Sequence, residues 1–127
     1  MSLLSFVTNQ ENRRGTFMSI QRHHPSKILC DIVQYENTVY LAGVVADDLT
    51  QDVKGQTSQV LKRVDQLLSE VGSNKSKVLT AQVWLNDIRH RNAMNEVWLS
   101  WVDSKNLPAR ACVEAKMADP TCLLSFP

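Results

Sequence analysis

The sequence has few cysteines and no long apolar run, and each absence excludes a class of protein. The cysteines Cys30, Cys112 and Cys122 form an odd set without CxxC or Cys/His zinc spacing, so neither a disulfide framework nor a structural metal site is predicted. No apolar stretch approaches the roughly 18 residues that a membrane span needs. The opening MSLLSFV is briefly apolar and lacks a basic leader, so we expect no secretory signal and a reducing, cytoplasmic setting.

An excess of charge of one sign is also absent. Lysine and arginine total 14, aspartate and glutamate total 13, and the formal net charge is +1, so surface charge predicts neither nucleic acid nor an acidic membrane as a partner. We interpret the short basic stretch IRHRN at 88–92 as a solvated helix start, with RNA contact as the alternative. His23, His24 and His90 lack a converging carboxylate or further histidine, so no metal is predicted.

The length of 127 residues fits one domain. We expect residues 18–127 to form this domain and residues 1–17 to be a flexible N-terminal extension, the alternative being an edge segment that docks on the core. CDIVQYEN and TVYLAGVVA predict two strands that meet in a tight turn at Glu36-Asn37. Gly43 lies inside the second strand, where glycine marks a bulge or a close approach of the backbone to another group.

The hydrophobic period changes after residue 50. Apolar residues at three- and four-residue steps predict a long helix from a cap at Thr50 or Asp52 to Gly72. KVLTAQVWLND then predicts a strand, RNAMNEVWLSWVDSK a second helix, and ARACVEAKM and TCLLSF two further strands. This order predicts an α+β fold, a mixed sheet with two helices packed on one face. The other face, with Tyr40 and Trp84, is too apolar to be plainly solvated, so we expect copies of the chain to cover it.

The stretch NLPARACVEAKM at 106–117 carries the main candidate for binding chemistry. Alternation places Arg110 and Cys112 on one face of a strand. We expect the residues of the opposite face to lie under the helices: Ala111, Val113, Ala115 and Met117. A guanidinium is a planar fork that matches a carboxylate with two parallel hydrogen bonds, which indicates a carboxylate ligand. The alternative is that Arg110 pairs with an acid of the protein such as Asp103 or Glu114.

Several stretches, taken in order, resemble a known family. VYLAGVVA, GSNKSKVLTAQVWLNDI and LPARACVEAK are similar to the Rid family (YjgF/RidA, reactive intermediate deaminases, endoribonuclease L-PSP-like). The resemblance runs from about Met18 to the C-terminus and covers a strand ending in glycine, a long helix closing at Gly-Ser-Asn, a strand ending in Leu-Asn-Asp, an Asn-rich helix start and Pro-Ala-Arg-x-Cys-Val-Glu. Within the family, the chain looks closer to a divergent branch than to the founding deaminases.

The resemblance implies a fold and a reaction. The fold is of the chorismate-mutase-like type, assembled as a homotrimer with a central β-barrel and with sites in the clefts between subunits. The reaction is that of a 2-iminobutanoate/2-iminopropanoate deaminase, which hydrolyses 2-aminoacrylate and related enamine or imine acids to 2-keto acids and ammonia, a form of metabolite damage control. This hydrolysis needs a carboxylate anchor and an aimed water, and no metal or organic cofactor.

The resemblance also implies site residues. Arg110 matches the family's substrate-carboxylate arginine, and we assign it the catalytic role of anchoring the substrate. Cys112 matches a cysteine that lines the pocket, Asn95 a polar pocket residue, and Gly43 a strand glycine whose backbone approaches the ligand. Cys112 is given no nucleophilic role, because nothing near it in the sequence would lower its pKa.

Two positions depart from the family pattern. Ala42 stands where the family commonly has a serine, and Ser125 stands where many deaminases carry an acid in their last strand. A serine cannot act as an ionised base at neutral pH without help, and Glu114 is a speculative substitute. The alternative function is therefore a trimeric protein that binds small carboxylates without hydrolysing them.

Overall fold

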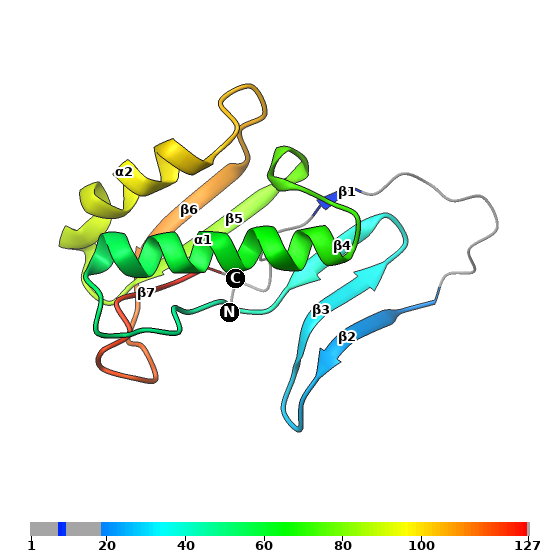
Figure 1. Cartoon of the computed structure of the whole chain (residues 1–127), viewed down its shortest axis with the longest axis horizontal. Coiled ribbons are helices and arrows are strands. Elements are labelled where there is room, and N and C mark those ends of the chain that lie inside the picture. The colour runs from blue at the N-terminus through cyan, green and yellow to red at the C-terminus, as the bar shows by residue number, and fades with distance from the viewer. Residues whose placement is uncertain (1–7, 10–18, 127) are drawn as a thin grey trace.

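The computed structural model describes residues 8–9 and 19–126, which adopt an α+β fold (Figure 1). Its strands are β1 (Thr8–Asn9), β2 (Gln21–Pro25), β3 (Cys30–Tyr35), β4 (Thr38–Leu41), β5 (Thr80–Leu85), β6 (Ala109–Glu114) and β7 (Leu124–Ser125). Its helices are α1 (Val53–Glu70) and α2 (Arg91–Trp101), with short 3-10 helices η1 (Lys75–Lys77) and η2 (Ile88–His90). The predicted order of strands and helices is confirmed.

The strands form two hydrogen-bonded sheets that meet at one edge. In the order β1-β4-β3-β2 all neighbours are antiparallel, and in the order β6-β5-β7 strand β5 is parallel to β6 and antiparallel to β7. An antiparallel bridge between Val44 and Phe126 joins the segment after β4 to the end of β7. The β3–β4 hairpin turns at Glu36-Asn37 as predicted, and Glu36 takes the positive φ of 52° that a two-residue hairpin turn requires.

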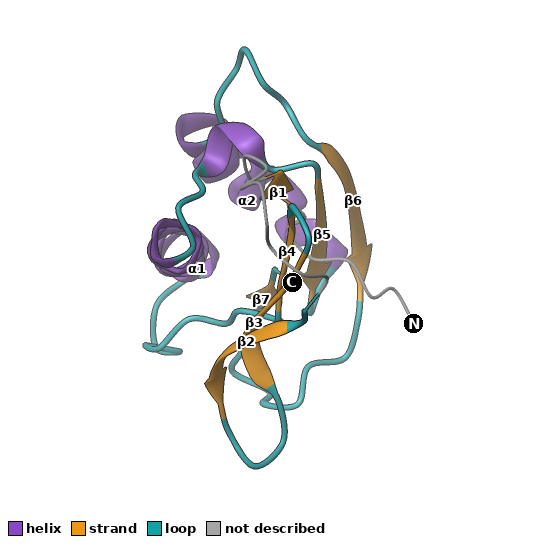
Figure 2. Cartoon of the chain, turned by 90° about the vertical axis from the view of Figure 1, so that its right-hand side faces the viewer, coloured by secondary structure: helices purple, strands orange, loops and turns teal. Residues whose placement is uncertain are grey.

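Both helices lie on the same side of the strands (Figure 2). Helix α1 begins where the Asp52 side chain accepts a hydrogen bond of 2.8 Å from the Gly55 amide, and it ends before Gly72, whose φ is +72°. The apolar stripe of α1 faces the sheet and is buried: Val60, Leu61, Val64, Leu67 and Leu68. The predicted cap and end of this helix are confirmed.

The core lies between the helices and the sheet. Ala81, Val83 and Leu85 of β5 are buried on the helix side, as the alternation predicts. Helix α2 contributes Met94 and Trp98, and the Trp98 ring stacks on Phe126 with centroids 5.7 Å apart. The end of β7 is therefore fixed under α2 by an aromatic contact.

A buried glutamine joins helix α1 to two loops. Gln56 is fully buried, and its Nε2 donates to the carbonyl oxygens of Leu49, Gln51 and Thr121 at 3.0–3.2 Å. Its Oε1 accepts a hydrogen bond of 2.9 Å from the Leu123 amide. These bonds fix the loop before α1 against the loop before β7.

The expected N-terminal extension falls mostly outside the described residues, so the boundary at residue 18 stays a prediction. Within that segment Thr8–Asn9 forms β1 and pairs with Val39 and Thr38 of β4. This pairing is compatible with the alternative of an edge segment that docks on the domain.

Candidate functional site

Arg110 and Cys112 lie on the helix side of β6, and the expectation that they face away from the helices is wrong. Strand β6 runs parallel to β5 with Ala81 opposite Arg110 and Val83 opposite Cys112. Residues opposite one another in adjacent strands share a face, and both of these β5 residues are buried under the helices. Val113, expected in the core, is instead 44% exposed on the other face.

The Arg110 side chain lies against helix α2. Its Nη1 is 3.7 Å from the Met94 sulfur, and its Cζ is 5.0 Å from the centroid of the Trp98 ring. The ring face attracts the cation, so Trp98 holds the guanidinium without neutralising it. Burial lowers the pKa of Arg110, yet a guanidinium stays charged in proteins.

The predicted alternative in which Arg110 pairs with Asp103 or Glu114 is not found. Asp103 accepts hydrogen bonds from the Ser76 hydroxyl at 2.7 Å and from the Asn106 side chain at 3.0 Å, and the first of these bonds is the main cause that lowers the pKa of Asp103 to about 2. Glu114 accepts a hydrogen bond of 3.0 Å from the Ile88 amide. No ion pair within the described part of the chain involves Arg110, so its charge is available to a ligand.

Cys112 shares the helix-side face of β6 with Arg110, and Asn95 belongs to helix α2, which Arg110 contacts. Burial raises the pKa of the Cys112 thiol, although Arg110 and Arg91 act in the opposite direction, so the thiol is protonated at neutral pH and is not a nucleophile. Asn95 is next to Met94 on α2, and its buried Oδ1 has no hydrogen-bond partner in the described structure. A buried oxygen without a donor favours a ligand that supplies one.

Arg91, the first residue of α2, was not among the predicted site residues. It is exposed, and it lies three, four and seven residues before Met94, Asn95 and Trp98, so all four share one helix face. Its charge acts on both Arg110 and Cys112. The signal that could have found it is this helical spacing from Asn95, combined with knowledge that α2 covers Arg110.

Gly43 is not brought together with the other predicted site residues within one chain. The strand order places β7 and β5 between the segment of Gly43 and strand β6. Three strand spacings separate their backbones by about 14 Å. Gly43 instead lies beside Ser125, whose Oγ would be 3.5 Å from a Cβ at position 43. A small polar hollow of about 150 Å³ adjoins it, lined in part by Asp31 and Arg63.

Ser125 is buried and engaged with the backbone. Its Oγ donates a hydrogen bond of 3.1 Å to the carbonyl oxygen of Val44. Trp84, opposite Ser125 in β5, lies on the face of the sheet away from the helices. The serine at the predicted acid position therefore has a structural hydrogen-bond partner.

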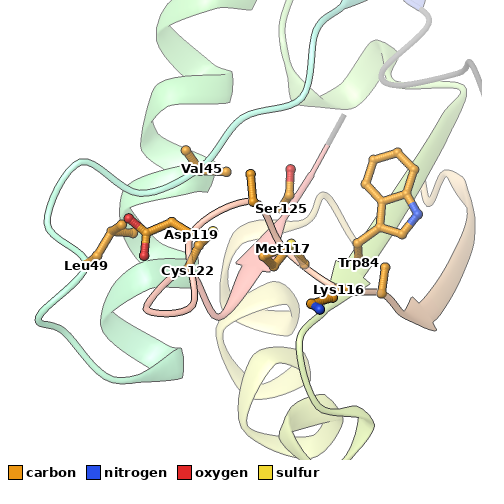
Figure 3. Close-up of a pocket in the computed structure, with 10 residues that line it drawn as sticks. Val45, Leu49, Trp84, Lys116, Met117, Asp119, Cys122 and Ser125 are labelled. Carbon is orange, nitrogen blue, oxygen red and sulfur yellow. The ribbon is translucent and has the colours of Figure 1, made fainter.

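An apolar hollow of about 440 Å³ opens on the sheet face away from the helices (Figure 3). Ser125 and Trp84 line it together with Val45, Leu49 and Met117, while Arg110, Cys112, Asn95 and Gly43 do not. Its lining carries the charged side chains of Lys116 and Asp119 at the rim (Figure 3). The hollow offers apolar surface rather than a set of reacting groups.

The histidines do not gather into a metal centre. Within residues 8–9 and 19–126, no group of three or more His, Cys, Asp or Glu side chains could hold a metal ion. The His24 and Glu70 side chains form a hydrogen bond, and Arg89 of the basic stretch 88–92 pairs with Asp87 at 2.6 Å. The helices of the described structure include none long and apolar enough to span a membrane.

Comparisons with known proteins bear on the family and the fold of the chain. The family model described as endoribonuclease L-PSP matches residues 20–124. A RutC family protein from Haemophilus influenzae is 44% identical over 104 residues, which cover 81% of this chain and 90% of the relative. A solved structure of a member of the YjgF protein family from Neisseria meningitidis has a TM-score of 0.83 and 34% identity, covering 86% of this chain and 91% of that one.

A more distant relative has a named reaction. The 3-aminoacrylate deaminase RutC of Acinetobacter baylyi is 28% identical over 97 residues, which cover 72% of this chain and 76% of the relative.

Proposed function

Because this chain belongs to the Rid family, also called the YjgF or endoribonuclease L-PSP family, we propose that it hydrolyses small 2-imino or 2-enamino carboxylic acids to 2-keto acids and ammonia. The observation that carries the proposal is the Arg110 guanidinium, which is partly buried, lies against α2 and has no carboxylate partner in the described residues. The named activity of the Acinetobacter relative supports this class of reaction. The free thiols of Cys30, Cys112 and Cys122 support a reducing, cytoplasmic setting.

Arg110 is proposed to anchor the substrate. Two parallel hydrogen bonds from the guanidinium hold the carboxylate, and each charge-assisted bond contributes roughly 1.5–3 kcal/mol. Water adds to the carbon of the C=N bond and one of its hydrogens passes to nitrogen, which gives a carbinolamine. The remaining hydroxyl hydrogen then passes to nitrogen as the C–N bond breaks, so ammonia leaves and the keto group forms. The Asn95 oxygen, which lacks a donor in the described structure, is proposed to accept an N–H of the imine or of the departing ammonia. Because Ser125 cannot act as an ionised base, we propose that positioning supplies the acceleration.

A second copy of the chain is proposed to complete the site. Gly43 lies about 14 Å from β6 within one chain, so its backbone can contact a ligand at Arg110 only from a neighbouring copy. The apolar hollow and the exposed Val113 on the uncovered sheet face support association with copies through that face. We therefore propose a homotrimer with its sites in the clefts between subunits.

The second candidate function is a trimeric protein that binds small carboxylates without hydrolysing them. The observation that favours it is the Ser125 hydroxyl, which donates to the Val44 carbonyl instead of standing free beside a substrate. This candidate retains the Arg110 anchor and lacks a group that removes a proton from water.

An enzyme assay separates these candidates. A pyridoxal-phosphate dehydratase generates 2-aminoacrylate in the presence of the purified full chain, and the release of pyruvate is followed against buffer. The deaminase proposal expects acceleration by the wild-type chain and a loss of about 10- to 100-fold in Arg110→Gln, since that variant removes the charge-assisted bonds. The matched control is Arg22→Gln. Arg22 is an exposed arginine of β2, which is an edge strand of the four-stranded sheet, whereas β6 belongs to the three-stranded sheet.

If the chain does not accelerate pyruvate release, calorimetry with 2-oxobutanoate shows whether it still binds a keto acid. Binding that Arg110→Gln abolishes, without acceleration of pyruvate release, supports the binding protein and rejects the deaminase. Absence of both binding and acceleration rejects both candidates. Thermal melting of each variant establishes that it is folded.

A further inference from the structure

Two arginines lie where strand β6 packs against helix α2, and neither has a carboxylate partner among the described residues. Arg110 extends from β6 against Met94 and Trp98, while Arg91 opens the same face of α2. None of the ion pairs or side-chain hydrogen bonds among residues 19–126 gives Arg91 or Arg110 a carboxylate partner. The nearby acids are engaged elsewhere, since Asp87 pairs with Arg89 and Glu114 accepts from the Ile88 amide.

The chain direction places the two arginines at different points along helix α2. Because α2 connects the parallel strands β5 and β6, it runs antiparallel to them, and its start lies near the carboxyl end of β6. The bond from the Ile88 amide to the Glu114 carboxylate confirms this direction. The Arg110 guanidinium lies at the level of Met94 and Trp98, so the Arg91 backbone is about 7 Å further along the helix. The long Arg91 side chain can cover that distance.

The two arginines differ in their surroundings. Arg110 is partly buried, whereas Arg91 is exposed. Both charges act on the thiol of Cys112, which follows Arg110 by two residues on the same face of β6. Each guanidinium also repels the other, which a ligand with a single carboxylate relieves only at Arg110. A ligand with two negative groups would relieve the repulsion at both.

We propose that the site is built for dicarboxylates, with the 1-carboxylate on Arg110 and a distal carboxylate on Arg91. This inference rests on the proposed function, because it assigns the substrate class of the same site. The substrate would be a 2-imino or 2-enamino dicarboxylic acid with a chain of about four or five carbons, long enough for its two acid groups to reach separate arginines. The hydrolysis itself is the same: water replaces nitrogen at the imine carbon, and ammonia leaves.

The test compares a dicarboxylate with a monocarboxylate of the same class. Calorimetry at low ionic strength measures binding of 2-oxoglutarate and 2-oxobutanoate, two stable keto acids, to the purified full chain. We expect 2-oxoglutarate to bind about fivefold more tightly, a modest factor because Arg91 is exposed. This preference should shrink in salt at about 0.2 M, because exposed charges are screened.

Variants assign the preference to Arg91. Arg91→Gln should remove the fivefold preference by weakening 2-oxoglutarate selectively, and Arg91→Lys, which keeps a charge, should restore part of it. Arg22→Gln, at an exposed arginine of β2, is the matched control and should keep the preference. Arg110→Gln should weaken both ligands.

The possible failures are distinguishable. If wild-type chain binds both keto acids equally and Arg110→Gln abolishes both, the dicarboxylate inference is overturned and the proposed function stands. If Arg91→Gln lowers the affinity for both ligands equally, Arg91 attracts any anion electrostatically without contacting a distal carboxylate, and the inference is likewise overturned. If neither keto acid binds, the Arg110 anchor fails and both proposals fall.

Discussion

At the scale of single residues, the Ser125 hydroxyl has a defined structural partner. It donates to the carbonyl oxygen of Val44, whose own backbone bridges Phe126. The bond therefore adds to the contact between the segment after β4 and strand β7, the place where the two sheets meet. We infer that a hydroxyl used in this structural bond does not act as the base that removes a proton from water. This matters because Ser125 stands at the position where many deaminases of the family carry an acid.

The change Ser125→Ala tests this assignment. We expect the free energy of unfolding to fall by about 1 kcal/mol, because the buried Val44 carbonyl loses a side-chain donor. We expect the rate of keto-acid release to stay at the wild-type value. Urea unfolding and the pyruvate assay measure the two quantities, with Ser58→Ala at an exposed position of α1 as the control. A large loss of turnover with little loss of stability would show that the hydroxyl takes part in the reaction.

At the scale of elements, Gln56 connects α1 with the loops on either side of the apolar hollow. Its three donated bonds and one accepted bond hold Leu49 and Thr121 against the helix, and Leu49 and Cys122 line the hollow. Gln56 lies on the buried face of α1, where the helical period would favour an apolar residue such as leucine. The role of its amide is therefore to bond the two loops and not to stabilise the helix itself.

The change Gln56→Leu should lower the free energy of unfolding by roughly 2–4 kcal/mol. The leucine fills a similar volume, but several buried backbone groups lose their partners. Chemical unfolding followed by circular dichroism measures this difference. The control is Gln66→Leu, at an exposed position of the same helix, for which we expect a change within about 0.5 kcal/mol. Equal effects of the two changes would contradict the structural role of Gln56.

The elements also show what the sequence could predict. The spacing of apolar residues in the sequence predicts α1, α2 and β5 and the face that each of them buries, because one side of each element is consistently apolar. The same reasoning chose the wrong face of β6, since Val113 and Met117 made the outer face look like the core face. Only the register with β5, in which Arg110 stands opposite the buried Ala81, decides the question. Register depends on contacts between strands 25–30 residues apart in the chain, which local pattern does not contain.

The site itself was predictable in part. The ordered family pattern pointed to Arg110, Cys112 and Asn95, and the fold places the first two on the face of β6 that packs against α2, the helix that carries Asn95. Arg91 was missed because a basic residue at a helix start is ordinarily solvated, and its relevance depends on which strand lies under the helix. The separation of Gly43 from β6 follows from the strand order, which no local motif encodes.

At the scale of the whole molecule, the sheet is covered by helices on one side (Figure 2). Trp84 and Val113 stand opposite one another in β5 and β6 on the uncovered side, next to the apolar hollow. Val113 is 44% exposed in the single chain, a large value for an apolar residue on the face of a strand. Association through this face would bury both residues.

We expect the wild-type chain to sediment at about three times its mass of 14.4 kDa, and Val113→Glu to dissociate it. A carboxylate at Val113 would have to be buried without a partner in the assembly, at a cost of several kcal/mol per subunit. Sedimentation velocity measures the mass, and the pyruvate assay should show parallel loss of turnover if the sites lie between subunits. The control is Leu99→Glu, at a residue of α2 that is 73% exposed on the helix side of the molecule, which should leave the assembly intact. A monomeric wild-type chain, or a Val113→Glu variant that stays assembled, would contradict association through the open sheet face.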